Sequence, residues 1–123
     1  METLNDIPTP ALVLDRTRLR ANAEFMTGRA KALGVNLRPH MKTAKSVDVA
    51  KLVTGASFGG ITVSTLREAR YFHGNGISDI TYAVGLAPAR ILEARELAGA
   101  GCRLKVLTDN VEVAAAIASG DAP

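Results

Sequence analysis

Short apolar runs alternate along the chain with longer segments in which apolar residues recur at helical spacing. Five of these runs predict buried strands, over residues 11–15, 36–42, 60–64, 79–84 and 103–108. Brief apolar runs bounded by turn residues are typical of strands that are covered on both faces. The second run is the weakest of the five, because Pro39 cannot donate a backbone hydrogen bond within a sheet.

The segments between the runs predict five helices, over residues 16–33, 46–55, 65–72, 88–98 and 111–118. The first has a predicted apolar face and stops at Gly34. That face consists of Leu19, Ala23, Phe25, Met26, Ala30 and Leu33. Ser46 and Asn110 are predicted caps of the second and fifth helices, and Pro88 suits the first turn of the fourth.

The predicted strands start at residues 11, 36, 60, 79 and 103, at spacings of 25, 24, 19 and 24 residues. Strands that alternate with helices at this spacing favour right-handed βα units and a parallel sheet. A doubly wound sheet and a (β/α)₈ barrel both fit. Five units fill an open sheet, but they make up only about half of a barrel of roughly 250 residues. No domain boundary or linker is visible inside the chain.

Composition and charge exclude several classes of protein. Fifteen Lys and Arg against twelve Asp and Glu leave a formal charge of +3 that is spread along the chain, and the five aromatic residues are too few for a base-stacking surface. A lone Cys102 fits a reducing compartment. The amino terminus lacks an apolar signal core, and no apolar stretch approaches the ~20 residues that span a bilayer. We therefore expect a soluble cytoplasmic protein that binds neither nucleic acid nor membrane.

The densest polar cluster, residues 38–45, follows the second predicted strand. Ligands of parallel α/β folds bind at the carboxyl ends of the strands, and alternation with a period of two puts His40 and Lys42 on one face. A desolvated lysine beside a cation has a lowered pKa, and its neutral amine forms an imine with an aldehyde. The alternative is that Lys42 and Lys45 are solvated loop lysines beside a helix start. His40, His73 and Cys102 do not show the spacing of metal ligands.

Four blocks of the sequence resemble one known family. They are Thr9–Asp15, Leu37–Thr43, Gly60–Ala69 and Gly76–Ala83, of which the Arg-Pro-His-x-Lys-Thr segment is the most specific. The chain resembles the amino-terminal part of the D-threonine aldolase and D-serine dehydratase family. These enzymes belong to the alanine racemase-like, fold-type III pyridoxal phosphate enzymes. The resemblance implies an α/β fold, a partial (β/α)₈ TIM-type barrel, with residues 1–123 as the amino-terminal part of one pyridoxal phosphate-binding barrel domain and the remainder absent.

The resemblance also implies the site residues. Lys42 is expected to form the internal aldimine with pyridoxal 5′-phosphate, and His40 to line the cofactor pocket. Ala44 departs from the family pattern, which often has His at this position, and this difference bears on the substrate preference. A divalent metal is implied for the full-length protein, with His and Cys ligands that lie outside this chain.

The implied function is a pyridoxal phosphate-dependent lyase that acts on D-3-hydroxy amino acids, of the D-threonine aldolase or D-serine dehydratase type. The alternatives are an amino-acid racemase of the same fold type and a non-catalytic pyridoxal phosphate-binding protein. A small D-amino acid is the expected substrate and a homodimer the expected assembly of the full-length protein. We expect the 123 residues alone to be inactive, because five βα units cannot close an eight-stranded barrel.

Overall fold

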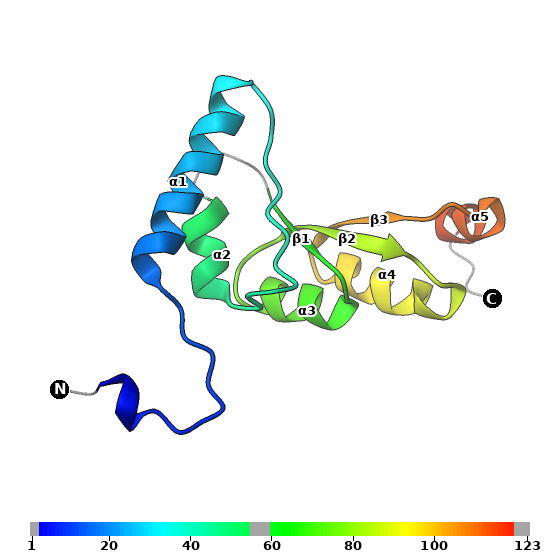
Figure 1. Ribbon diagram of the computed structural model, residues 1–123. Helices are drawn as coiled ribbons and strands as arrows, with labels where there is room; N and C mark the ends of the chain where they lie inside the picture. Colours follow the sequence, from blue (N-terminus) through cyan, green and yellow to red (C-terminus); the bar gives the residue numbers. More distant parts are fainter. Residues whose placement is uncertain (1–2, 55–59, 120–123) are drawn as a thin grey trace.

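The computed structural model describes residues 3–54 and 60–119, which form helices, a small sheet and two single turns of 3₁₀ helix (Figure 1). The α-helices are α1 (Arg16–Ala32), α2 (Val47–Thr54), α3 (Leu66–Gly74), α4 (Ile91–Gly99) and α5 (Val111–Ser119). The strands are β1 (Ile61–Val63), β2 (Asp79–Gly85) and β3 (Arg103–Leu107). The 3₁₀ turns are η1 (Leu4–Asp6) and η2 (Pro88–Arg90), and η2 leads directly into α4.

The three strands form a parallel sheet in the order β1-β2-β3, which confirms the predicted parallel βα units. Helices α3 and α4 connect consecutive strands and lie together on one face of the sheet (Figure 1). Ile61 pairs with Ile80, and Ile80 with Leu104, so one row of side chains faces these helices. The next row, Thr62, Thr81 and Lys105, points to the opposite face.

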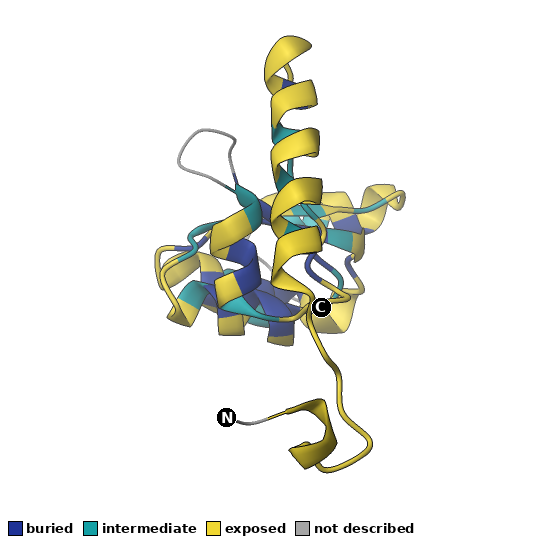
Figure 2. Cartoon of the chain, turned by 60° about the vertical axis from the view of Figure 1, so that its left-hand side comes forward, coloured by how far each residue is buried: buried dark blue, intermediate teal, exposed yellow. Residues whose placement is uncertain are grey.

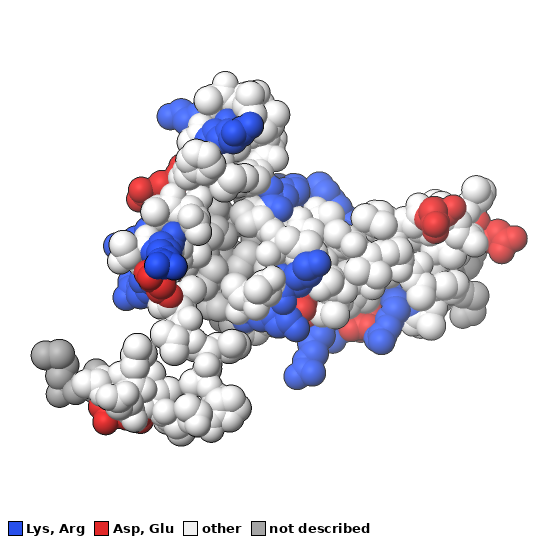
Figure 3. All heavy atoms as spheres, viewed as in Figure 1, with Lys and Arg blue, Asp and Glu red and all other residues white. Residues whose placement is uncertain are grey.

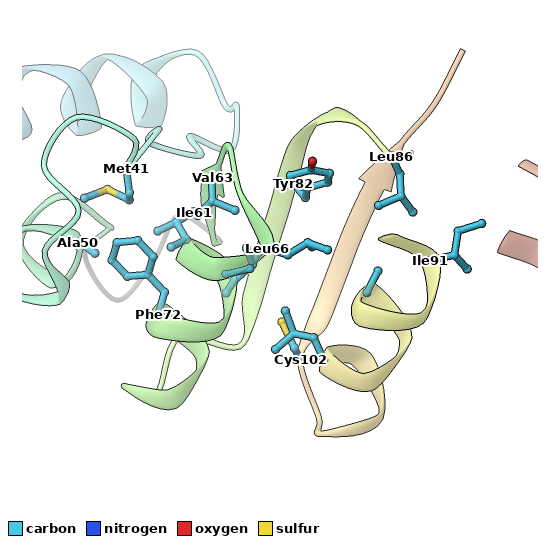
Figure 4. Close-up of a cluster of buried hydrophobic side chains, with 14 of the residues drawn as sticks. Met41, Ala50, Ile61, Val63, Leu66, Phe72, Tyr82, Leu86, Ile91 and Cys102 are labelled. Atoms are coloured by element: carbon cyan, nitrogen blue, oxygen red, sulfur yellow. The ribbon is translucent and has the colours of Figure 1, made fainter. Parts of the chain in front are cut away.

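The hydrophobic core lies between the sheet and its helices (Figure 4). Phe72 of α3 is completely buried, as are Ile61 of β1 and Ile80 of β2. Tyr82 of β2 and Ile91 of α4 extend the same cluster toward β3. The open face of the sheet, opposite α3 and α4, carries polar residues instead.

The strand predicted over residues 11–15 does not form, so this prediction is wrong. The segment has no regular secondary structure, and Leu12, Val13 and Leu14 are exposed (Figure 2). A strand is stable only when a neighbour accepts and donates its backbone hydrogen bonds. None of the three strands in the described part of the chain pairs with this segment. Asp15 instead caps α1, where its carboxylate accepts a hydrogen bond from the Arg18 N–H at 3.0 Å.

The strand predicted over residues 36–42 is reduced to a single parallel bridge between His40 and Thr62. The Thr62 N–H donates to the Pro39 carbonyl at 2.9 Å, and the Met41 N–H donates to the Thr62 carbonyl at 2.8 Å. Proline at position 39 cannot donate the next bond of this ladder, toward Gly60, and the pairing stops there. The weakness attributed to Pro39 in the sequence is therefore the reason that the strand is short.

Helix α1 has the predicted extent but not the predicted buried face. Only Ala30 of the predicted apolar face is buried, whereas Phe25, Met26 and Leu33, the residue after the helix, are exposed. The helix packs mainly on α2. The caps predicted for the other helices are present: Ser46 and Asn110 accept hydrogen bonds from the Val49 and Val113 N–H groups.

Charged side chains are spread over the face of the molecule seen in Figure 3, in several separate groups. None of the helices within residues 3–54 and 60–119 has the length and apolar character needed to cross a membrane.

Candidate active site

The open face of the sheet carries a row of polar residues from four neighbouring segments. The pairings align His40 with Thr62 of β1, Thr81 of β2 and Lys105 of β3. Residues at one level of a parallel sheet point to the same side, so all four face away from α3 and α4. β1 ends at Val63, one residue beyond this row, whereas β2 and β3 continue to Gly85 and Leu107. A ligand of a parallel α/β fold is expected to bind at the carboxyl ends of the strands.

His40 and Lys42 lie at this carboxyl edge, and both are exposed. Residues 41–44 form a turn, which the Lys45 N–H closes by donating to the Met41 carbonyl at 2.9 Å. Strand alternation therefore ends before Lys42. The turn brings the two residues together in another way, because the Lys42 N–H donates to Nδ1 of His40 at 3.2 Å. Lys42 is exposed, so in the described part of the chain its side chain is open to solvent and not desolvated.

A cluster of charges holds the segment that precedes Lys42. Nη2 of Arg38 lies 2.7 Å from Oδ2 of Asp79, and Nη1 lies 3.4 Å from the Thr81 hydroxyl. Nζ of Lys105 lies 2.7 Å from Oδ1 of the same carboxylate, and Nη2 of Arg103 lies 3.8 Å from Oδ2. The hydrogen bond from Arg38 is the largest cause that lowers the pKa of Asp79 to about 2, and the Lys105 contact adds to it against the opposing effect of burial.

A second acidic residue holds the turn that follows Lys42. The Glu68 side chain is nearly buried at the start of α3, and its carboxylate lies 3.3 Å from Nζ of Lys45. It also accepts hydrogen bonds from the Ser64 N–H at 2.9 Å and from the Ser64 hydroxyl at 3.2 Å. Burial raises the pKa of Glu68, but the hydrogen bonds from Ser64 and Lys45 outweigh it, so the pKa is lowered overall. Lys45 has a φ of 45°, a left-handed conformation that is uncommon for a lysine.

The sequence motif indicated His40 and Lys42, but the contacts of Asp79, Glu68 and Lys105 were not predicted. A usable signal was present for two of them: Asp79 and Lys105 are charged residues inside runs that otherwise predict buried strands. Such residues must point away from the apolar core and find partners. Glu68 stands three residues after Thr65, the spacing of a capping box, and the Glu68 N–H indeed donates to the Thr65 hydroxyl at 3.0 Å.

The arrangement presents a primary amine, an imidazole and two threonine hydroxyls at one edge of a sheet. An exposed amine can bind an aldehyde covalently, and the neighbouring imidazole can exchange a proton with a bound group. Arg38, Arg103 and Lys105 outnumber the single carboxylate of Asp79, so the formal charge near the amino ends of β2 and β3 is net positive. Within the described residues, no group of three or more His, Cys, Asp or Glu side chains could hold a metal ion.

Known proteins match nearly the whole chain. It is 48% identical over 118 residues to D-threo-3-hydroxyaspartate dehydratase of Delftia sp. (strain HT23), a match that covers 96% of this chain and 31% of that protein. It is 36% identical to D-serine dehydratase of Dictyostelium discoideum, over 90% of this chain and 29% of the relative. It is 32% identical to D-threonine aldolase of Arthrobacter sp., over 89% and 29%. The chain thus spans about a third of the length of these relatives.

Solved structures agree with these matches. The D-threo-3-hydroxyaspartate dehydratase from Delftia sp. HT23 superimposes with a TM-score of 0.92 over 98% of this chain and 32% of that one, at 48% identity. A variant of that dehydratase has been solved in a metal-free form. An alanine racemase-like protein from Idiomarina loihiensis gives a TM-score of 0.83 at 34% identity, over 94% of this chain and 32% of that one. No family model matches the sequence.

The fold defines the class of protein. The chain is an α/β fragment whose parallel three-stranded sheet matches part of the alanine racemase-like barrel. Within that class, the chain matches the amino-terminal segment of the family that contains D-threo-3-hydroxyaspartate dehydratase, D-serine dehydratase and D-threonine aldolase. The family resemblance expected from the sequence blocks is confirmed.

Proposed function

We propose that this chain is the amino-terminal part of a pyridoxal phosphate-dependent lyase that acts on D-3-hydroxy amino acids. One observation carries the proposal: the amine of Lys42 stands exposed at the carboxyl edge of the sheet, in a chain that is 48% identical to a D-threo-3-hydroxyaspartate dehydratase. Three of the relatives, two dehydratases and one aldolase, are named for different substrates, and each of those substrates is a D-amino acid. We extend that substrate class to this protein.

The residues present fit pyridoxal phosphate. Lys42 is exposed, and its amine would hold the cofactor covalently through Nζ. The cofactor supplies an electron sink for the bonds around the substrate Cα. His40 would lie beside it. Because Nδ1 of His40 accepts the Lys42 N–H, the proton of the neutral imidazole is on Nε2, and that nitrogen remains to donate to a bound group.

The metal and the rest of the barrel belong to the same proposal. We assign residues 1–123 to the amino-terminal part of one barrel domain, which the coverage of about a third of each relative supports. The described residues offer no cluster of metal-ligating side chains. A divalent metal in the full-length protein would therefore take its ligands from residues outside this part of the chain.

Covalent trapping tests the role of Lys42. The protein is incubated with pyridoxal 5′-phosphate, reduced with borohydride and mapped by mass spectrometry. We expect the adduct on Lys42 and its loss in Lys42→Ala. Lys45→Ala is the matched control, because Lys45 is an exposed lysine three residues away that contacts Glu68. An adduct that survives in Lys42→Ala and disappears in Lys45→Ala would overturn the assignment.

Product analysis tests the reaction. The protein that carries this sequence is given D-threo-3-hydroxyaspartate and D-threonine. A keto acid with ammonia indicates elimination, whereas glycine with an aldehyde indicates cleavage between Cα and Cβ. We expect elimination, because the relative at 48% identity is a dehydratase. Conversion of the D- to the L-amino acid with neither set of products would contradict the proposal and favour a racemase.

A further inference from the structure

The segment that carries the proposed cofactor lysine is weakly attached to the sheet through its backbone. Within the described residues, its backbone pairs with β1 at a single bridge, between His40 and Thr62. In a parallel ladder the next bond toward the amino terminus would run from the N–H of residue 39 to the Gly60 carbonyl. Proline has no N–H, so this bond cannot form. The segment therefore needs another contact to keep its register.

The side chain of Arg38 makes such a contact by crossing β1. Its guanidinium reaches Asp79 and Thr81 on β2, at 2.7 Å and 3.4 Å, whereas its own backbone lies on the far side of β1. Gly60 leaves the space for this crossing. A Cβ at Gly60 would lie 2.8 Å from Nη1 of Arg38 and 1.7 Å from the Asp79 carbonyl oxygen. The Thr62 hydroxyl completes the attachment by donating to the Arg38 carbonyl at 3.2 Å.

We propose that Asp79 is a positioning residue, which acts through Arg38 to hold the segment bearing His40 and Lys42 in register against β1. Its significance for catalysis rests on the proposed role of Lys42. The ion pair replaces the backbone bond that Pro39 removes, and it is made two residues before the bridge. The Arg38 and Asp79 side chains are 27% and 16% exposed, so water screens this pair less than an ordinary surface pair.

The other partners of Asp79 provide a matched comparison. Nζ of Lys105 lies at the same 2.7 Å from the carboxylate, but it joins β3 to β2, which are already paired by backbone hydrogen bonds. Loss of Lys105 thus removes an ion pair of equal length without releasing the segment. The proposal accordingly predicts unequal effects from removing Arg38 and from removing Lys105.

Amide hydrogen exchange measures the register directly, without cofactor. The reporter is the Met41 N–H, which donates to the Thr62 carbonyl, and the reference is the Ala69 N–H inside α3. We expect Arg38→Gln and Asp79→Asn to speed Met41 exchange about tenfold relative to Ala69, and Lys105→Gln to change it less than about twofold. Asp79→Glu should restore most of the protection. Equal acceleration by Arg38→Gln and Lys105→Gln, or acceleration of Met41 and Ala69 together, would overturn the proposal.

Covalent trapping then links register to the proposed function. In Asp79→Asn we expect the ratio of cofactor adduct on Lys42 to adduct on Lys45 to fall severalfold, with recovery in Asp79→Glu. An unchanged ratio in Asp79→Asn would overturn the link to Lys42. If the unsubstituted protein gives no adduct on Lys42, the proposed function fails, whereas the exchange experiment still decides whether Asp79 positions the segment.

Discussion

The charge cluster around Asp79 predicts a specific acid dependence of stability. The perturbation is Asp79→Asn, which keeps the size of the side chain but removes its negative charge. The contacts of Asp79 with Arg38 and Lys105 lower its pKa from 3.8 to about 2. At about 1.4 kcal/mol per pKa unit, this difference corresponds to about 2.5 kcal/mol. Lys105 and Arg103 are more than half exposed, so screening reduces the contribution to about 1–2 kcal/mol.

The sign follows from the direction of the pKa change. Because the folded-state pKa of Asp79 lies below its unfolded value, the stabilisation is fully present above 3.8 and is lost as the pH falls through about 2. The assay is urea unfolding of the unsubstituted protein and of Asp79→Asn between about pH 5 and pH 2. We expect the difference in free energy of unfolding to shrink by about 1–2 kcal/mol over this range. A difference that stays constant with pH would refute the reasoning.

Two further substitutions test the packing around the site and the core, each by urea unfolding. Gly60→Ala places a Cβ against the Asp79 backbone and should cost about 3 kcal/mol, whereas Gly74→Ala, which meets nothing within 4 Å, should be neutral or slightly stabilising. Phe72→Ala empties a completely buried position and should cost about 3–5 kcal/mol, against less than about 0.5 kcal/mol for the exposed Phe25→Ala. Equal losses of unfolding free energy in Gly60→Ala and Gly74→Ala would contradict the close approach at Gly60. Equal losses in Phe72→Ala and Phe25→Ala would contradict the burial of Phe72.

The candidate site shows how far its residues could be found in advance. Lys42 and His40 stand in a recognisable motif at the end of an apolar run, so local sequence is enough to single them out. Asp79 lies 41 residues away from Arg38 in the chain, and nothing local in the sequence relates the two. Their contact depends on the order of β1 and β2 and on the missing side chain at Gly60. Glu68 could be predicted in part. Its capping contact with Thr65 is local in the sequence, but its contact with Lys45 is not.

By itself, the sequence determined the features that depend only on interactions between residues close together in the chain. These are the alternation of helices with apolar strands at 61–63, 79–85 and 103–107, the caps at Ser46 and Asn110, and the motif that contains Lys42. Helical and extended periodicities and capping chemistry are local, so they can be read from neighbouring residues.

Only the tertiary structure decided which apolar runs pair and which charges meet. The run at 11–15 has every local property of a strand, yet it stays unpaired because no strand in the described part of the chain lies beside it. The segment before Lys42 pairs at one point only, and the crossing of Arg38 to Asp79 compensates for the bond that Pro39 cannot make. Both outcomes depend on partners distant in sequence, because backbone hydrogen bonds between strands and ion pairs form only when the fold brings the two groups together.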